Sequence, residues 1–130
     1  MKGLEKDILK YLKERGWDNL RPSDLAKSIM IEGAELLELF QWDNQELKGV
    51  RKNKEKLESI KKELADVMIY AIEMSVLLGL DTKEIIRTKL HKSAEKYPAK
   101  LMKKNAKKGA GSGGDTDYWK IKRAHRVKVK

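Results

Sequence analysis

The chain has 130 residues, of which 38% are charged and 6% aromatic, and it contains no Cys. This length suits one modest domain, and the missing Cys excludes disulfide-framed scaffolds, cysteine-ligated metal sites and thiol chemistry. The net charge of +10 lies mostly at the C-terminal end, because residues 1–102 hold 20 Lys and Arg against 18 Asp and Glu, whereas residues 103–130 hold 10 against 2.

Apolar residues recur at helical spacing through the first hundred residues, which predicts an all-α fold. We expect an antiparallel helical bundle with two long central helices. The expected helices are a short one that Gly16 closes, one from about Ser23 to Trp42, one from Arg51 or Lys54 to Leu78, and one from Asp81 to Tyr97. Residues 67–80 are apolar on nearly all sides, which a lone four-helix bundle of this size would hardly cover, so we expect a homodimer.

The expected domain is residues 1–102, and residues 103–130 form an expected tail. The tail contains the run GAGSGG, which is typical of a flexible linker, and it ends in a basic segment. We expect it to be unstructured, either natural or added for expression, with weak nucleic-acid binding as the alternative. No targeting or membrane-spanning segment is visible, and the lack of Cys fits a reducing compartment, so we expect a cytoplasmic protein without a membrane partner.

Three acidic residues stand out on the helix expected after Pro22. Glu32 occupies a position on an apolar stripe. An unpaired carboxylate buried there would cost about 2 kcal/mol or more, so it needs a cation or a proton. Glu35 and Glu38 follow at successive i+3 positions and project from neighbouring parts of the same face. This spacing predicts an anionic cluster suited to a hard divalent cation.

A second acidic pair repeats the pattern on the next long helix. Glu63 and Asp66 share a face with Tyr70 and Glu73. Together with Glu32 and Glu35 they predict a metal site with oxygen ligands, which favours Mg²⁺, with Mn²⁺ as a substitute. Glu73 is the only charge between residues 67 and 80, and it either joins the metal site or forms a buried ion pair.

Three segments carry a family resemblance: RPSDLAKSIMIEGAELLELFQW, KKELADVMIYAIEMSVLLGLD and KLHKSAEKYP. In motif order and spacing they resemble the MazG-like nucleotide pyrophosphohydrolases, particularly the house-cleaning branch similar to dCTP pyrophosphatase, over roughly residues 17–98. The resemblance implies an all-α bundle that forms dimers, often paired into tetramers. It also implies Mg²⁺-dependent hydrolysis of nucleoside triphosphates to nucleoside monophosphate and pyrophosphate.

The resemblance also assigns roles to individual residues. It makes Glu32, Glu35, Glu63 and Asp66 the metal ligands. Of these we expect Glu35 or Glu32 to orient the attacking water, and from its place on the same face we expect Glu38 to position water or act in the outer shell. It places Trp17, Trp42 and Tyr70 at the base, and Lys89, Lys96 and Tyr97 at the phosphates. Ser93 stands where the family has Asn, so its contact to the substrate differs. Two alternatives stay open: an enzyme like phosphoribosyl-ATP pyrophosphatase, and a helical module that binds nucleic acid through the basic tail.

Overall fold

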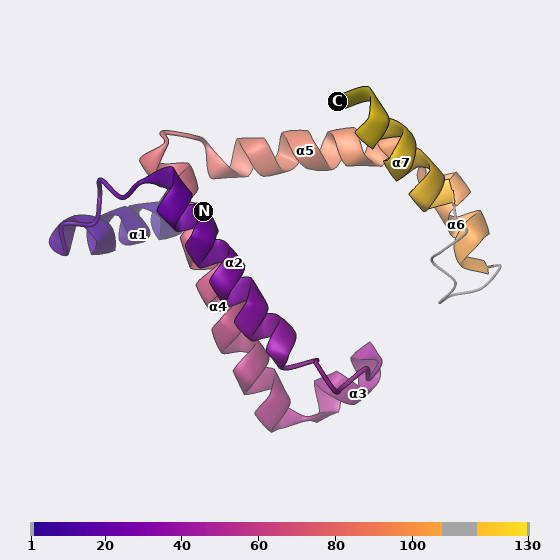
Figure 1. Ribbon diagram of the computed structural model, residues 1–130, viewed down its shortest axis with the longest axis horizontal. Coiled ribbons are helices and arrows are strands. Elements are labelled where there is room, and N and C mark those ends of the chain that lie inside the picture. Colours follow the sequence, from indigo (N-terminus) through magenta and orange to yellow (C-terminus); the bar gives the residue numbers. More distant parts are fainter. Residues whose placement is uncertain (1, 108–116, 130) are drawn as a thin grey trace. The chain divides into compact units, whose positions relative to one another are not determined.

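The computed structural model describes residues 2–107 and 117–129, and every regular element within them is an α-helix. This confirms the predicted all-α class. The helices are α1 (Lys2–Glu14), α2 (Pro22–Glu38), α3 (Leu47–Lys52), α4 (Lys54–Leu77), α5 (Thr82–Lys96), α6 (Ala99–Lys107) and α7 (Asp117–Val129), as labelled in Figure 1. The chain forms two compact units, residues 1–82 and residues 83–130. None of the described helices is long and apolar enough to cross a membrane.

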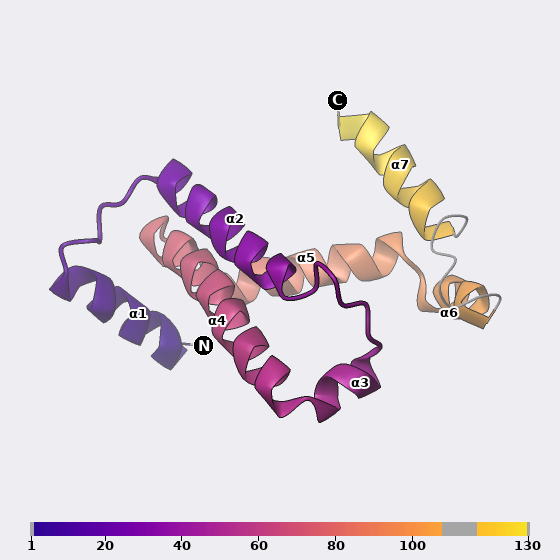
Figure 2. The ribbon, with the colours of Figure 1, turned by 60° about the horizontal axis from the view of Figure 1, so that its bottom comes forward.

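The first unit is built around the antiparallel pair α2 and α4, which lie side by side in both views (Figures 1 and 2). Helix α1 packs along α4. Its contact is a small apolar core of Ile8, Leu12 and Ile72, against which Val76 and Leu77 pack. Leu12 is fully buried, so this core fixes the face of α1 that looks toward α4.

Two glycines end helices of this unit in the left-handed conformation. Gly16 follows α1 with φ +69° and Gly79 follows α4 with φ +70°. In each case the next residue closes a Schellman turn: Trp17 N–H donates to the Leu12 carbonyl at 2.9 Å, and Leu80 N–H donates to the Ser75 carbonyl at 2.9 Å. The turn at Gly16 therefore sets the position of Trp17.

The second helix and its connection to α4 differ in detail from the sequence prediction. Helix α2 ends at Glu38, four residues before the expected end. Beyond it the backbone tightens into turns, as in the hydrogen bond from Phe40 N–H to the Leu37 carbonyl at 2.9 Å. Helix α4 begins at Lys54, the later of the two expected starts, because the Asn53 side chain caps it by accepting from Lys56 N–H at 3.0 Å.

Many large apolar side chains of the first unit remain exposed. Met30, Ile31 and Leu37 of α2 are 58–70% exposed, and Met68 of α4 is 50% exposed. The sequence argument for uncovered apolar surface on α4 is thus consistent with the structure of the single chain. The homodimer that would cover this surface stays a prediction.

The second unit is helical and strongly basic. It holds 16 Lys and Arg against 4 Asp and Glu, whereas residues 1–82 hold 14 against 16. We expected residues 103–130 to be unstructured, but their described part contains the end of helix α6 and helix α7, which contact each other. The ring of Tyr118 also stacks on that of Tyr97, with centroids 4.8 Å apart. The GAGSGG run lies outside the described residues, and the predicted domain boundary after residue 102 stays a prediction.

Candidate active site

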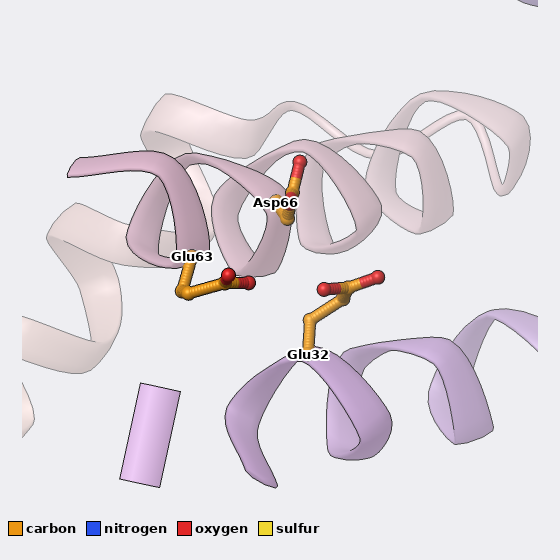
Figure 3. Close-up of side chains that lie close together, drawn as sticks. All are labelled: Glu32, Glu63 and Asp66. Carbon is orange, nitrogen blue, oxygen red and sulfur yellow. The ribbon is translucent and has the colours of Figure 1, made fainter. Parts of the chain in front are cut away.

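Three carboxylates from two helices meet between α2 and α4. Figure 3 shows Glu32 of α2 pointing toward Glu63 and Asp66 of α4. One carboxylate oxygen from each lies within 4.8 Å of the other two. The antiparallel pairing of α2 and α4 produces this meeting, because it sets the E-x-x-E segment of one helix opposite the E-x-x-D segment of the other.

The cluster has an unfavourable electrostatic environment in the protein alone. Burial raises the pKa of Glu32, and its hydrogen bond with and repulsion from Glu35 raise it further. Burial likewise raises the pKa of Glu63, again with a contribution from Glu35. Glu35 therefore belongs to the same acidic neighbourhood although its own side chain is more exposed. A bound cation would therefore stabilise the ionised form of these carboxylates.

The arrangement fits a hard divalent cation. Glu32 Oε2 and Glu63 Oε2 are both buried and have no hydrogen-bond partner, so each has a lone pair free for a ligand. Two oxygens on opposite sides of one Mg²⁺ lie about 4 Å apart, close to the spacing of this cluster. Glu32, Glu63 and Asp66 could hold such an ion with little movement, and Glu35 is near enough to join them.

Two adjoining cavities lie beside α4, and the larger one reaches the cluster at Asp66. The larger, about 350 Å³, is lined by Asp66, Asp7 and Ile8 among others, and the smaller, about 240 Å³, by Trp17, Asp24 and Ser28 among others. Tyr11, Tyr70 and Glu73 line both cavities. The cavities therefore join an acidic wall at Asp66 to an aromatic wall at Trp17.

The aromatic side chains of the smaller cavity are fixed by the first turn of the fold. The rings of Tyr11 and Trp17 meet edge to face with centroids 6.0 Å apart. Burial raises the pKa of the Tyr70 phenol, with further contributions from nearby acids, so this group stays protonated and can donate a hydrogen bond. The structure thus brings Trp17 and Tyr70 together, as two parts of one cavity wall.

Glu73 fulfils neither expectation from the sequence. Its side chain is only 4% exposed, yet it is not among the three clustered carboxylates. Burial alone raises its pKa, and none of the described residues forms an ion pair with it. The predicted buried ion pair is therefore absent from the described part of the chain.

Two predicted site residues lie away from these cavities. Trp42 follows the C-terminal end of α2 and is 92% exposed, whereas Trp17 precedes the N-terminal end. A helix of this length separates its ends by about 25 Å, so one chain does not place both indoles at the same base. Glu38 is exposed at the last residue of α2, outside the three-carboxylate cluster.

The predicted phosphate contacts lie in the second unit. Lys89 is exposed on α5, and Lys96 Nζ lies 5.2 Å from the centroid of the Tyr97 ring. Tyr97 N–H donates to the Ser93 carbonyl at 2.8 Å, which holds the end of α5 in shape. Their roles toward a substrate stay predictions.

Sequence reasoning missed the residues that α1 and the start of α2 contribute to the cavities. The sequence alone singles out none of the residues Asp7, Tyr11, Asp24 and Ser28 as members of a site. No motif marks these positions, because only the packing of α1 and α2 on α4 brings them together. The one signal in the sequence was a tyrosine, with its polar hydroxyl group, among the apolar residues of the first helix.

The comparisons with known proteins agree with one another. A model of the MazG-like family matches residues 27–111. The chain is 27% identical to dCTP pyrophosphatase 1 of Homo sapiens over 100 residues, or 75% of this chain and 59% of that protein, and 28% identical to dCTP pyrophosphatase 1 of Mus musculus over 99 residues, or 74% and 58%. It thus spans less than three-fifths of the length of these relatives.

A solved structure gives the same indication. The crystal structure of a pyrophosphatase from Archaeoglobus fulgidus DSM 4304 superposes with a TM-score of 0.66 at 32% sequence identity. The match covers 75% of this chain and 92% of that one. The fold is therefore shared over most of both chains.

Proposed function

The chain belongs to the MazG-like family, and from that premise we propose that it hydrolyses nucleoside or deoxynucleoside triphosphates to the monophosphate and pyrophosphate, with Mg²⁺ as cofactor. This is a nucleotide-pool house-cleaning activity. The relatives named dCTP pyrophosphatase and the pyrophosphatase of known structure support the general reaction. Their names do not define the base or sugar that this chain prefers.

The observation that carries the proposal is the carboxylate cluster of Glu32, Glu63 and Asp66 between α2 and α4. A triphosphate is strongly anionic, so an acidic site can bind it only with positive charge between them, and a bound Mg²⁺ supplies that charge. The two buried, unpartnered oxygens of the cluster support this assignment over a solvated acidic surface.

Within this proposal the acidic residues have separate tasks. Glu32, Glu63, Asp66 and Glu35 would hold the cation, which would supply positive charge to the phosphates of the substrate. Glu35, the more exposed of the four, or Glu32 accepts a hydrogen bond from the attacking water and orients it in line with the scissile bond. We propose a supporting, outer role for Glu38, and Mn²⁺ as a substitute for Mg²⁺.

The remaining predicted residues bind the rest of the nucleotide. The cavity walled by Trp17 and Tyr70 is an aromatic surface on which a base can stack. Lys89 and Lys96 balance the charge of the leaving pyrophosphate, with Tyr97 and Ser93 as polar contacts. Trp42 contacts the base only if another copy of the chain supplies it, which is consistent with a homodimer or a pair of dimers.

The apolar residues left exposed on α2 and α4 support that assembly. We expect the dimer, possible pairing of dimers into a tetramer, and a cytoplasmic location on the grounds given by the sequence. An enzyme like phosphoribosyl-ATP pyrophosphatase is the less favoured alternative, because the relatives found are dCTP pyrophosphatases.

One observation favours a second, additional activity. The excess of 16 Lys and Arg over 4 Asp and Glu in residues 83–130 suits a polyanion such as a nucleic acid. We propose nucleic-acid binding only as an accessory property, because it would give no role to the half-buried acidic residues of the first unit.

The test of the proposed function is pyrophosphate release from a panel of ribo- and deoxyribonucleoside triphosphates, with Mg²⁺ and with excess chelator. We expect release only with the metal, and nucleoside monophosphate as the other product. Release of inorganic phosphate with nucleoside diphosphate, or no hydrolysis of any triphosphate, would contradict the proposal. Glu55→Gln, at an exposed position in the first turn of α4, is the matched control and should retain full activity.

A further inference from the structure

We propose that Glu73 reads the edge of the nucleobase and selects bases in which an unprotonated ring nitrogen lies beside an exocyclic amino group, as in cytosine and adenine. The inference rests on the proposed function and adds a specificity-determining residue to it.

The first argument is that Glu73 is a largely buried acidic residue that lines the cavities. Glu73 is 4% exposed, and it lines both cavities beside α4. No described residue forms an ion pair with it, and burial is the one cause that raises its pKa. A ligand that fills the cavities can therefore provide hydrogen bonds that no described residue gives this carboxyl group.

The second argument is the charge of the surroundings. The ionisable groups that line the cavities with Glu73 are Asp7 and Tyr11 from α1, Asp24 from the start of α2, and Asp66 and Tyr70 from α4. All are acids or phenols, and none is a cation. Burial raises the pKa of Glu73, and the lining offers no cation that would lower it. The neutral form that burial favours carries one O–H donor and one carbonyl acceptor.

The third argument is the position of Glu73 relative to the carboxylate cluster. Glu73 follows Asp66 by two turns of the same helix, which places the two residues on nearly the same face, about 10 Å apart along the axis. Tyr70 lies between them and also lines both cavities. This separation matches the reach of a nucleoside, with the phosphates at Asp66 and the edge of the base at Glu73.

The chemistry of the base edge then gives the selectivity. In cytosine and adenine the ring nitrogen accepts a hydrogen bond and the adjacent amino group donates one, so a neutral carboxyl group pairs with both. In thymine, uracil and guanine the corresponding ring nitrogen carries a hydrogen, and the acid must donate to a less basic carbonyl oxygen instead. An ionised Glu73 would present two acceptors and favour guanine.

The test compares dCTP, dATP, dTTP and dGTP as substrates of the full-length enzyme and of three variants. Glu73→Gln keeps a donor and an acceptor, Glu73→Met removes both at similar size, and Glu55→Gln is the control on the exposed face of α4. We expect kcat/KM of the wild type to favour dCTP and dATP by about tenfold or more. Glu73→Gln should keep the preference, and Glu73→Met should reduce it to about twofold or less.

A pH profile adds a readout that a purely structural role would not affect. The preference of the wild type should weaken as pH rises and Glu73 ionises, whereas the preference of Glu73→Gln should not change. A Glu73→Met enzyme that keeps the base preference, or a wild type that prefers dGTP, would overturn the inference.

Equilibrium binding of dCMP, dAMP, dTMP and dGMP to the same proteins separates this inference from the proposed function. If no triphosphate is hydrolysed, the proposed function fails, and binding still decides the role of Glu73. Equal binding of all four monophosphates by the wild type contradicts the inference. Should Glu73→Met fail to fold, the comparison of wild type with Glu73→Gln across pH decides in the same way.

Discussion

Replacing Gly16 with Ala tests whether the turn after α1 positions the aromatic wall of the cavity. Gly16 has φ +69°, and a Cβ added there meets no atom within 4 Å, so backbone strain is the whole cost. That strain amounts to about 1–2 kcal/mol for a residue with a side chain. For a chain of this size it lowers the midpoint of thermal unfolding by about 4 °C per kcal/mol.

Gly79 provides a matched control. It has φ +70°, an added Cβ there also meets nothing within 4 Å, and its turn has the same pattern of hydrogen bonds. Gly79→Ala should therefore cost the same stability. The residue that follows Gly16 is Trp17, which lines the smaller cavity, whereas the residue that follows Gly79 is Leu80, which lines neither cavity.

The two variants should consequently differ in function at equal stability. The strain can shift the turn at Gly16 toward conformations that release Trp17, so we expect KM for the preferred nucleotide to rise by up to about tenfold in Gly16→Ala, with little change in kcat. Gly79→Ala should keep the wild-type KM. Thermal unfolding with steady-state kinetics checks both. Equal KM values for the two variants, or no loss of stability in either, would refute the reasoning.

Four further outcomes are expected. Glu32→Gln should abolish pyrophosphate release and weaken Mg²⁺ binding seen by calorimetry, yet raise the unfolding temperature of the metal-free protein, because it removes a charge from a crowded acidic cluster; unchanged turnover would disprove its role as a ligand. Because burial raises the pKa of Glu73, the folded protein binds more protons than the unfolded protein at pH values just above the ordinary carboxyl pKa. The free energy of unfolding therefore falls as pH rises through the raised pKa. Thermal scans should show a smaller fall in Glu73→Gln. Deleting residues 108–130 removes seven Lys and Arg and two Asp; gel-shift assays should show weaker, strongly salt-dependent nucleic-acid binding, while turnover stays as in the full chain. Sedimentation at micromolar concentration should show dimers or tetramers, and a stable monomer would contradict the assembly.

The sequence predicted the features that depend on helical periodicity. The acids of α2 and α4 could be placed on faces because residues three and four apart on a helix lie together, and the pairing of the two helices then brought Glu32 to Glu63 and Asp66. The sequence also predicted the helix ends at Gly16 and Gly79, since both residues adopt the left-handed conformation that favours glycine after a helix.

Other features depend on contacts between distant segments, which periodicity does not reveal. The cavity wall at Tyr11 exists because Ile8 and Leu12 hold α1 against α4. The sequence did not predict the helix over residues 117–129, because a basic segment after a glycine-rich run is typical of an unstructured tail. The stacking of Tyr118 on Tyr97 depends on a contact between distant segments, so it could not be predicted either. The absence of a described partner for Glu73 likewise follows from three-dimensional packing.

Under the proposed function, the placement of Asp66, Tyr70 and Glu73 along one helix has a consequence for how such enzymes can diverge. A helix is a stiff rod, so a substitution at residue 73 leaves the register of the acidic cluster two turns away intact. Substrate choice could then change through a single position without rebuilding the reaction centre, and an altered preference need not begin with a damaged catalyst. The same separation would let protein engineers retune this scaffold toward an unwanted or modified nucleotide by varying residue 73 while keeping Glu32, Glu63 and Asp66 fixed.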